Sequence, residues 1–461
     1  MSEVHKNINN IQSVYFIGIG GIGMSAIAKY FLSRGIKVSG YDRTETEITR
    51  QLQAAGASVH YSEEVTAIPK DVDYVVYTPA IPKEHKELVF YQANGYNVVK
   101  RSDILKLITE SSFNICVAGT HGKTTTSTMI AHLLRHSGFG CNAFLGGTSA
   151  NYGTNFWSSE NNVCVIEADE YDRSFLKLSP DIAVITAVDA DHLDIYENEE
   201  NVKEAFRQFA AKVKPGGLLL KKLGLDNGLQ ATETVSYSIQ NTGADVYATN
   251  IVLKDGGYRF DAKVKEKVIE GLQLNMGGLH NVENMVAAIA VAAGLGIDTE
   301  KIKAAVADFK GVKRRFEYIV KQKDLVFIDD YAHHPEELSA LINGVKSLFP
   351  EKRCTLIFQP HLYSRTRDFA DDFARVLDAA DNVILLPVYP ARELPIEGVD
   401  SNMVADRMRL GNKAVMTKEQ LLSWVEQDFK EHNRTHGDIL ITAGAGDIDK
   451  LLAPVKEILL K

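Results

Sequence analysis

The chain has 461 residues, enough for two or three domains that each bury a hydrophobic core. Its formal net charge of −9 gives no basic footprint for nucleic acid, so an anionic substrate must be held by local amides, cations or a metal ion. It lacks a run of eighteen apolar residues and its first ten residues are polar, so we expect a cytoplasmic protein without membrane insertion.

The first expected element is a strand over residues 14–17, which leads into a glycine-rich loop and a helix over residues 24–32. The loop has the glycine spacing of dinucleotide-binding proteins, in which backbone amides at a helix N-terminus hold a diphosphate. After the next expected strand, residues 37–41, a carboxylate commonly binds a ribose hydroxyl. This pattern fits NAD and fits any other nucleoside diphosphate equally well. The candidate residues are Gly18, Gly20, Gly21, Ile22, Gly23 and Asp42.

A second glycine-rich loop follows the apolar run 113–118 and precedes a helix-like segment, residues 127–135. In such a loop the backbone amides face phosphate oxygens, Lys123 neutralises the β/γ charge and the Thr124 hydroxyl ligates Mg²⁺. It departs from the strict P-loop pattern, because Val117 stands where the first glycine belongs. Two such loops predict two phosphorylated substrates and favour a ligase or kinase over a dehydrogenase. The candidate residues are Gly119, Thr120, His121, Gly122, Lys123, Thr124 and Thr125.

Acidic clusters follow two further expected strands of this region. Glu167, Asp169 and Glu170 come after the strand 162–167, at the carboxyl edge of the sheet that carries the second loop. A carboxylate there can hold Mg²⁺ beside the triphosphate, and a solvated acidic loop is the alternative. His192 follows the strand 182–188 in the same way, although histidine is an unusual ligand for a hard cation.

The rest of the chain predicts hairpins, helices and a further α/β unit. Charged or glycine-containing turns separate strands over 246–253, 258–264 and 268–274, with helices over 281–293 and 300–309. The last unit combines strands over 325–328, 354–358, 383–387 and 439–443 with helices over 336–348 and 368–380. The sequence therefore predicts three domains, residues 1–107, 108–312 and 313–461.

Polar motifs also follow strands in the last unit. Asp330 and His333 follow the strand 325–328, and His361 and Arg365 follow the strand 354–358. They offer a neutralisable base and a cation for a carboxylate. Arg315, which precedes them, could reach a developing phosphoryl charge, and a solvated surface is the alternative for either arginine.

Together these motifs resemble those of the Mur ligases, in order and over essentially the full chain. The matching segments are residues 16–25, 119–124, 167–170, 191–194, 280–284, 330–335 and 359–361. The resemblance implies an α/β fold of three domains: a Rossmann-like N-terminal domain that takes a UDP-sugar and not NAD, a P-loop-type central ATPase domain with a mixed sheet, and a Rossmann-like C-terminal domain that takes the amino acid.

The resemblance also implies a reaction and a set of site residues. ATP would convert the lactyl carboxylate of UDP-N-acetylmuramate to an acyl phosphate, which L-alanine would attack, with Mg²⁺ as cofactor. The implied Mg²⁺ ligands are Thr124, Glu170 and His192. The ATP site gains His280, Asn281, Asn284 and Asp330. The alanine site is His333, His361 and Arg365, and the catalytic residues are Lys123, Arg315 and His333.

Other readings remain open at this point. One is a recycling ligase that attaches a preformed tripeptide to the same UDP-sugar and needs a wider C-terminal pocket. Another is an NAD-dependent oxidoreductase, and a third is a nucleotide-regulated binding protein without turnover. Phosphate release that requires UDP-N-acetylmuramate, ATP and L-alanine together separates them. The sequence does not define the oligomeric state.

Overall fold

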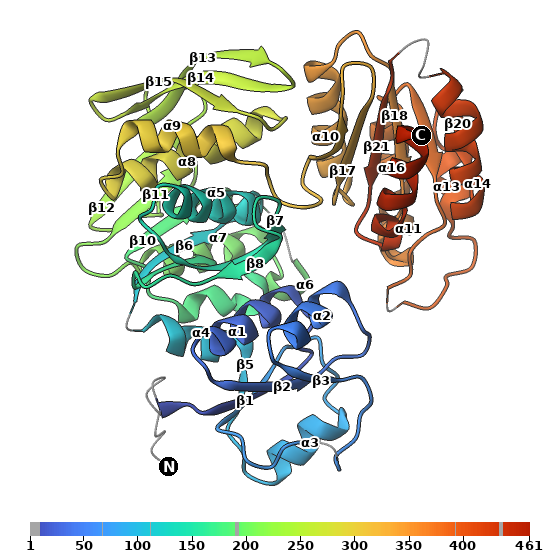
Figure 1. The fold of residues 1–461 in the computed structure, drawn as a ribbon. Helices are drawn as coiled ribbons and strands as arrows, with labels where there is room; N and C mark the ends of the chain where they lie inside the picture. The colour runs from blue at the N-terminus through green and yellow to red at the C-terminus, as the bar shows by residue number, and fades with distance from the viewer. Residues whose placement is uncertain (1–9, 67, 111, 190–192, 392, 433–436) are drawn as a thin grey trace. The chain divides into compact units, whose positions relative to one another are not determined.

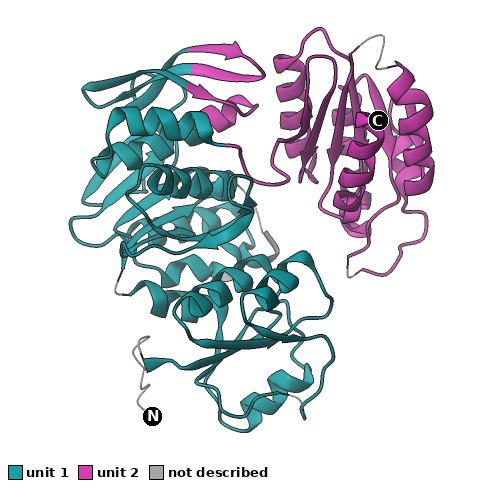
Figure 2. Cartoon of the chain, viewed as in Figure 1, with its two compact units in different colours: residues 1–250, 260–272, 283–309 teal, residues 251–259, 273–282, 310–461 magenta. Residues whose placement is uncertain are grey.

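The structure is a computed structural model that describes residues 10–461, apart from 67, 111, 190–192, 392 and 433–436. Its described residues form three sheets of five, ten and six strands with helices between them (Figure 1). The chain divides into two compact units (Figure 2), residues 1–250, 260–272 and 283–309 and residues 251–259, 273–282 and 310–461. None of the described helices combines the length and the apolar character that crossing a lipid bilayer requires.

The first sheet is parallel throughout, with the order β3-β2-β1-β4-β5. Its central strand β1 is apolar and buried on both faces, as a strand between parallel neighbours must be. The strand order reverses beside β1, so the loop after β1 opens at the point where ligands bind in such sheets. The elements are β1 (Ser13–Ile17), α1 (Ile22–Ser33), β2 (Lys37–Tyr41), α2 (Glu47–Ala54), β3 (Ser58–His60), β4 (Tyr74–Tyr77), α3 (Lys86–Ala93), β5 (Val98–Lys100) and α4 (Arg101–Thr109).

The second sheet is mixed, with the order β15-β14-β13-β12-β11-β10-β6-β9-β7-β8. It is parallel from β13 to β7, whereas β8 runs antiparallel to β7. The strands are β6 (Phe113–Ala118), β7 (Asn142–Ser149), β8 (Thr154–Trp157), β9 (Val163–Glu167), β10 (Ile182–Ile185), β11 (Leu218–Lys222), β12 (Glu233–Ser238), β13 (Val246–Lys254), β14 (Gly257–Val264) and β15 (Lys267–Leu274). The helices are α5 (Lys123–His136), α6 (Leu193–Tyr196), α7 (Glu199–Ala210), α8 (Leu279–Gly294) and α9 (Thr299–Asp308), with a 3₁₀ helix over Tyr171–Lys177.

Helix α1 joins the first two sheets into one core. The Tyr30 ring lies 5.6 Å from Phe144 of β7 and 6.2 Å from Phe156 of β8. The Lys29 ammonium donates to Asn155 Oδ1 at 2.9 Å, and burial lowers the pKa of this lysine. The amide nitrogen of Asn155 in turn donates to the Ile22 carbonyl in the first turn of α1. The start of α1 is therefore held directly against the second sheet.

The third sheet has the order β16-β17-β21-β18-β19-β20, parallel except for β16. Its strands are β16 (Glu317–Lys321), β17 (Val326–Asp330), β18 (Cys354–Phe358), β19 (Asn382–Leu385), β20 (Lys413–Val415) and β21 (Ile439–Ala443). Its helices are α10 (Pro335–Leu348), α11 (Tyr363–Asp368), α12 (Ala370–Leu377), α13 (Ser401–Ala405), α14 (Lys418–Trp424) and α16 (Leu452–Leu460).

The predicted fold class, three α/β domains with a mixed central sheet and Rossmann-like ends, is confirmed, and the helix expected over residues 368–380 is present as the shorter α12. The segment 368–380 is interrupted at Phe369, whose φ of −113° and ψ of 19° are not helical. The Phe369 ring packs edge-on against His334 at 4.7 Å. This tertiary contact accompanies the break between α11 and α12, and a helical sequence pattern does not reveal it.

Candidate functional site

The second glycine loop lies between two strand ends. Strand β6 has β10 on one side and β9 on the other, so the loop after β6 is flanked by the residues that follow those strands. Gly119 has a φ of 143°, and a Cβ at this position would lie 2.1 Å from Thr186 Oγ1. The Thr186 hydroxyl donates to the Ala118 carbonyl at 3.2 Å and also to the His121 carbonyl. Only glycine fits here, and Thr186 is a loop-holding residue that sequence reasoning missed.

The other loop residues contact the end of β10 or open helix α5. The Thr120 amide donates to the Ala187 carbonyl at 3.1 Å, and the Thr120 hydroxyl accepts from the Asp189 amide at 3.1 Å. His121 Nε2 lies 3.9 Å from Asp189 Oδ2. Gly122 has a φ of 80° at the N-cap of α5. The loop shape is therefore held by hydrogen bonds across the carboxyl edge of the sheet.

Lys123, the first residue of α5, points back over the loop. Its ammonium donates to the Gly119 carbonyl at 2.7 Å and to Glu170 Oε1 at 2.7 Å. The Glu170 side chain is 1% exposed. Burial raises the pKa of Glu170, and the Lys123 charge opposes that rise. The lysine and the carboxylate thus form a buried ion pair beside the loop.

Thr124 contacts a different carboxylate from the one the sequence indicated. Its hydroxyl donates to Glu167 Oε1 at 2.9 Å, and the Gly146 amide donates to Glu167 Oε2 at 2.9 Å. Burial raises the pKa of Glu167, and Lys123 opposes this. Glu167 was not among the assigned site residues, although it ends β9 and pairs in register with Val117 of β6. This register, which spacing alone does not give, brings Glu167 to Thr124.

The oxygen donors around the loop suit a hard divalent cation. A threonine hydroxyl and buried carboxylates are ligands that Mg²⁺ prefers, so Thr124, Glu167 and Glu170 fit such an ion. His192, the third ligand implied by the resemblance, lies outside the described residues.

Helix α8 supplies the three residues implied for the adenine region. Asn284 lies at the loop, because a Cβ on Gly122 would be 3.0 Å from Asn284 Oδ1. Asn281 donates through its amide nitrogen to the Gly277 carbonyl at 2.6 Å. His280 is exposed and lies beside Gly278. Asn284 belongs to the first compact unit, and the other two belong to the second.

Hydrogen bonds to the end of β2 and to Asp42 hold the first glycine loop in shape. The Gly18 and Ile19 amides donate to the Tyr41 carbonyl at 2.8 and 3.0 Å. The Gly20 amide donates to Asp42 Oδ2 at 2.7 Å, and a Cβ on Gly20 would lie 2.8 Å from that oxygen. Asp42 therefore fixes the shape of the loop. The sequence predicted that it binds a ribose and did not predict this structural role. Gly21 is the N-cap of α1, and Ile22 and Gly23 form its first turn.

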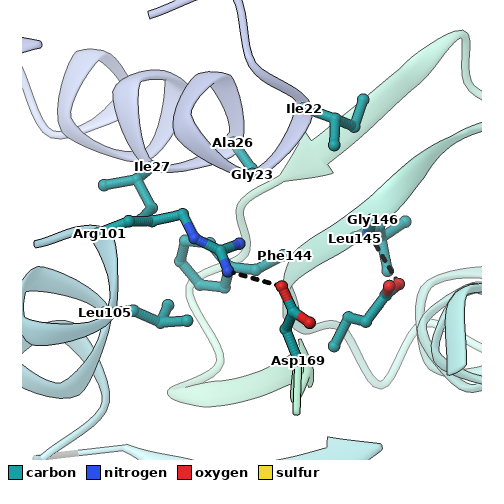
Figure 3. A pocket seen from close by; sticks show the side chains of 11 residues that line it. Ile22, Gly23, Ala26, Ile27, Arg101, Leu105, Phe144, Leu145, Gly146 and Asp169 are labelled. Atoms are coloured by element: carbon teal, nitrogen blue, oxygen red, sulfur yellow. Dashed lines mark hydrogen bonds and ion pairs between the residues drawn. The ribbon is translucent and has the colours of Figure 1, made fainter. Parts of the chain in front are cut away.

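A cavity of about 120 Å³ lies between the start of α1 and the end of β9 (Figure 3). Ile22 and Gly23 of α1 line one side, and Gly146, Glu167 and Asp169 line the other. Arg101, the first residue of α4, also lines it, with Nη2 3.0 Å from Asp169 Oδ2. The cavity thus extends from the helix that follows the first loop to the carboxylate that contacts Thr124.

Two predicted residues of the second unit lie where β17 ends. Asp330 accepts from the Phe316 amide at 2.7 Å and from the Ala332 amide at 2.8 Å. Burial raises the pKa of Asp330, and the Arg315 charge opposes that rise. Arg315 lies over the Tyr331 ring, 5.4 Å from its centroid. Asp330 therefore fixes the backbone at Phe316, before β17, and at Ala332, after it. The sequence predicted a contact of Asp330 with ATP and did not predict this structural role.

The structure brings His333, His361 and Arg365 together. The two imidazole rings are 6.0 Å apart, and Arg365 Nη1 lies 3.5 Å from His361 Nδ1. Burial lowers the pKa of His333 and lowers that of His361 to about 4, so both rings are neutral at pH 7. Tyr389, which sequence reasoning missed, stacks on His361 at 5.8 Å with an interplanar angle of 15°. The cluster offers a neutral base beside a cation and an aromatic wall.

Comparison with known proteins identifies the family. The chain matches, in order, the models described as Mur ligase family, catalytic domain, over residues 13–112, Mur ligase middle domain over 117–292, and Mur ligase, glutamate ligase domain, over 314–446. It is 47% identical over 464 residues to a UDP-N-acetylmuramate-L-alanine ligase of Parabacteroides distasonis, with 99% of each chain covered. It is 45% identical over 460 residues to the protein of the same name from Cytophaga hutchinsonii, covering 98% of this chain and 97% of that one.

Solved structures agree with this result. The UDP-N-acetylmuramate-alanine ligase MurC of Thermotoga maritima matches with a TM-score of 0.80 at 27% identity, over 98% of both chains. A murein peptide ligase of Psychrobacter arcticus shares the fold, with a TM-score of 0.68 at 21% identity over 96% of this chain and 99% of that one. The chain belongs to the Mur ligase family.

Proposed function

We propose that this protein is an ATP-dependent ligase that joins L-alanine to the lactyl carboxylate of UDP-N-acetylmuramate, in the synthesis of peptidoglycan precursors. The observation that carries the proposal is the cavity that extends from Ile22 and Gly23 to Glu167, the carboxylate that Thr124 contacts, in a chain about 45% identical to ligases of that name. A sugar nucleotide at the first loop and ATP at the second would bring an acid and a γ-phosphate together in this cavity. The reaction forms ADP and phosphate through an acyl phosphate.

The first step is phosphoryl transfer to the carboxylate. The loop over residues 119–125, at the N-terminus of α5, and the Lys123 ammonium would bind the triphosphate, with Asn281, Asn284 and His280 at the base. Lys123 would exchange its contact with Glu170 for the phosphate oxygens that gain charge. Arg315 is proposed as a second cation for that charge, and Asp330 as a residue that holds its segment in place.

A magnesium ion is proposed for the same step. Thr124, Glu167 and Glu170 are the described residues that would hold it, together with His192 as the resemblance implies. When bound, Mg²⁺ would neutralise the phosphate charge that develops during transfer.

The second step is attack by the amine of L-alanine. Arg365 would bind the alanine carboxylate, and His361 and Tyr389 would form the wall of a small pocket. His333 is neutral at pH 7 because burial lowers its pKa, so it can accept a proton from the attacking amine. Its Nδ1 lies 2.9 Å from the Tyr331 carbonyl, which fixes the ring orientation and leaves Nε2 for that proton.

The domain assignment follows from these roles. We assign residues 1–107 to the UDP-sugar, with Gly18, Gly20, Gly21, Ile22 and Gly23 at the diphosphate and Asp42 beside it. Residues 108–312 take ATP and residues 313–461 take the amino acid. The substrates are small molecules, with no nucleic acid or membrane among the partners, and we place the enzyme in the cytoplasm.

Phosphate release with each substrate omitted in turn tests this function. We expect release only when UDP-N-acetylmuramate, ATP and L-alanine are all present. The tripeptide L-alanyl-γ-D-glutamyl-meso-diaminopimelate should not replace alanine, and NAD should not bind in calorimetry. Efficient turnover of the tripeptide would assign the chain to the recycling ligases instead. Phosphate release with ATP as the only substrate would instead identify the protein as a nucleotide hydrolase.

A further inference from the structure

The cavity between the start of α1 and the end of β9 is lined by a cation that the functions assigned so far do not use. Arg101 is the only lysine, arginine or histidine among the described residues that line this cavity (Figure 3). The other polar side chains that line it are the carboxylates of Glu167 and Asp169. Among these lining side chains, the Arg101 guanidinium is the one whose charge is opposite to that of an additional anion.

The position of Arg101 is defined from two sides. Asp169 Oδ2 lies 3.0 Å from Nη2, and Asp169 Oδ1 in turn accepts from the Tyr171 amide at 3.1 Å. On the other side, a Cβ added to Gly23 would lie 2.3 Å from Arg101 Nη1. The glycine thus leaves room for the guanidinium against the first turn of α1. A side chain at position 23 would push the guanidinium out of this place.

A contribution to folding stability does not explain the ion pair between Arg101 and Asp169. The Arg101 and Asp169 side chains are 27% and 37% exposed, and pairs with such exposure contribute little to folding stability. A guanidinium carries five N–H donors in one plane, so a single carboxylate does not exhaust its hydrogen-bonding capacity. The same planar donors match a second carboxylate in a bidentate contact.

Lys123, the cation of the second glycine loop, already has other partners. The Lys123 ammonium contacts Glu170 and the Gly119 carbonyl, and its role with the nucleotide directs it to phosphate. A substrate carboxylate that enters the cavity next to Glu167 and Asp169 would meet like charges, and it needs a counter-charge of its own. Arg101 is placed to supply it.

We propose that Arg101 binds the lactyl carboxylate of the acid substrate and orients it toward the transferred phosphoryl group, with Asp169 and Gly23 as the residues that position the guanidinium. This rests on the proposed function and adds a substrate-binding residue to it. The arginine would discriminate between sugar nucleotides with a carboxylate and those without one, because both kinds present the same diphosphate to the first loop.

Calorimetry with two sugar nucleotides tests the proposal on the full chain. UDP-N-acetylmuramate carries the lactyl carboxylate, whereas UDP-N-acetylglucosamine shares its nucleotide and lacks that group. We expect Arg101→Met to weaken binding of the first roughly ten- to a hundred-fold, as loss of a charge-assisted hydrogen bond predicts, and to leave the second within about twofold. Arg101→Lys keeps the charge without the bidentate geometry and should fall in between.

Two further variants complete the design. Lys106→Met removes a cation from the same helix, but Lys106 is 51% exposed and pairs with Glu110, so both affinities should stay unchanged. Asp169→Asn should loosen the guanidinium and reproduce part of the selective loss of Arg101→Met. Equal weakening of both nucleotides in Arg101→Met would place the arginine at the diphosphate, and no weakening would make it a surface ion pair. Either result overturns the proposal.

These outcomes are separate from the test of the ligase activity itself. If the wild-type protein releases no phosphate with UDP-N-acetylmuramate, ATP and L-alanine, the proposed function fails whatever Arg101 does. If the wild-type protein is active and Arg101→Met is equally active at limiting UDP-N-acetylmuramate, only the role of Arg101 fails.

Discussion

The buried ion pair of Lys123 and Glu170 leads to a prediction about folding stability that can be tested without measuring enzyme activity. Replacing Lys123 with Met removes the ammonium, while Glu170 keeps its burial, with 1% of its side chain exposed. Removing one partner of a buried ion pair costs about 3–5 kcal/mol, because a buried carboxylate loses its counter-charge. We expect a loss of that size for Lys123→Met near neutral pH.

The loss of stability in Lys123→Met should depend on pH, and the protonation of Glu170 determines whether it grows or shrinks as the pH rises. Burial already raises the pKa of this carboxyl, and without Lys123 the pKa rises further. The folded variant then keeps a proton at pH values where the unfolded chain, with a glutamate pKa of about 4.3, has lost it. Unfolding releases that proton, so the free energy of unfolding falls by up to about 1.4 kcal/mol per pH unit as the pH rises through this window. Lys123→Met should therefore approach the wild type in mild acid.

Urea unfolding followed by tryptophan fluorescence measures this effect. The chain has two tryptophans, and Trp424→Phe leaves Trp157, a buried residue of the first unit, as the reporter. In that background, Lys123→Met combined with Glu170→Gln should recover much of the stability and lose the pH dependence, because no buried charge remains. A loss in Lys123→Met that is equal at all pH values, and equal in the double variant, would contradict the buried-charge explanation.

Three other predictions concern the two loops and their support. Gly20→Val should weaken UDP-N-acetylmuramate binding at least about tenfold in calorimetry and leave an ATP analogue unaffected, because the new side chain meets Asp42; equal losses for both ligands would contradict it. Glu167→Gln should raise the Mg²⁺ concentration for half-maximal phosphate release roughly tenfold, whereas an unchanged requirement would remove Glu167 from the metal site. Burial lowers the pKa of His132 to about 4, so the unfolded chain binds the extra proton between about pH 4 and 6.5 and stability rises with pH there. His132→Gln should flatten that rise in the Trp157 unfolding assay, and an unaltered slope would contradict the assignment.

The strands that carry chemistry were predictable because they are short apolar runs. Phe113–Ala118, Cys354–Phe358 and Ile439–Ala443 have the predicted bounds, since strands buried between parallel neighbours are apolar at nearly every position. Three-residue strands such as Ser58–His60 and Lys413–Val415 were not predicted. They have no apolar pattern of their own, and their geometry comes from pairing with β2 and β19.

Within the candidate site, the sequence indicated which segments meet but not which side chains pair. Several acids follow β9, and only the register of Val117 with Glu167 decides that Glu167 reaches Thr124. Thr186 and Arg101 belong to no motif, and their places depend on strand order and on helix packing. Tertiary register of this kind is not encoded in local spacing.

The contact of α1 with β7 and β8 bears on how this enzyme can be dissected. A fragment that ends near residue 107 would leave Tyr30 and its neighbours without the phenylalanines they pack on, and Lys29 without Asn155. Such a fragment would expose an apolar helix face and tend to aggregate. The third sheet has a separate hydrophobic cluster built around Phe327, Ile357 and Leu440. The second compact unit, however, also includes residues 251–259 and 273–282, and the Tyr318 hydroxyl donates to the Gly256 carbonyl, so a cut just before Arg314 would divide that unit. A truncated protein should therefore keep the two glycine loops on one polypeptide.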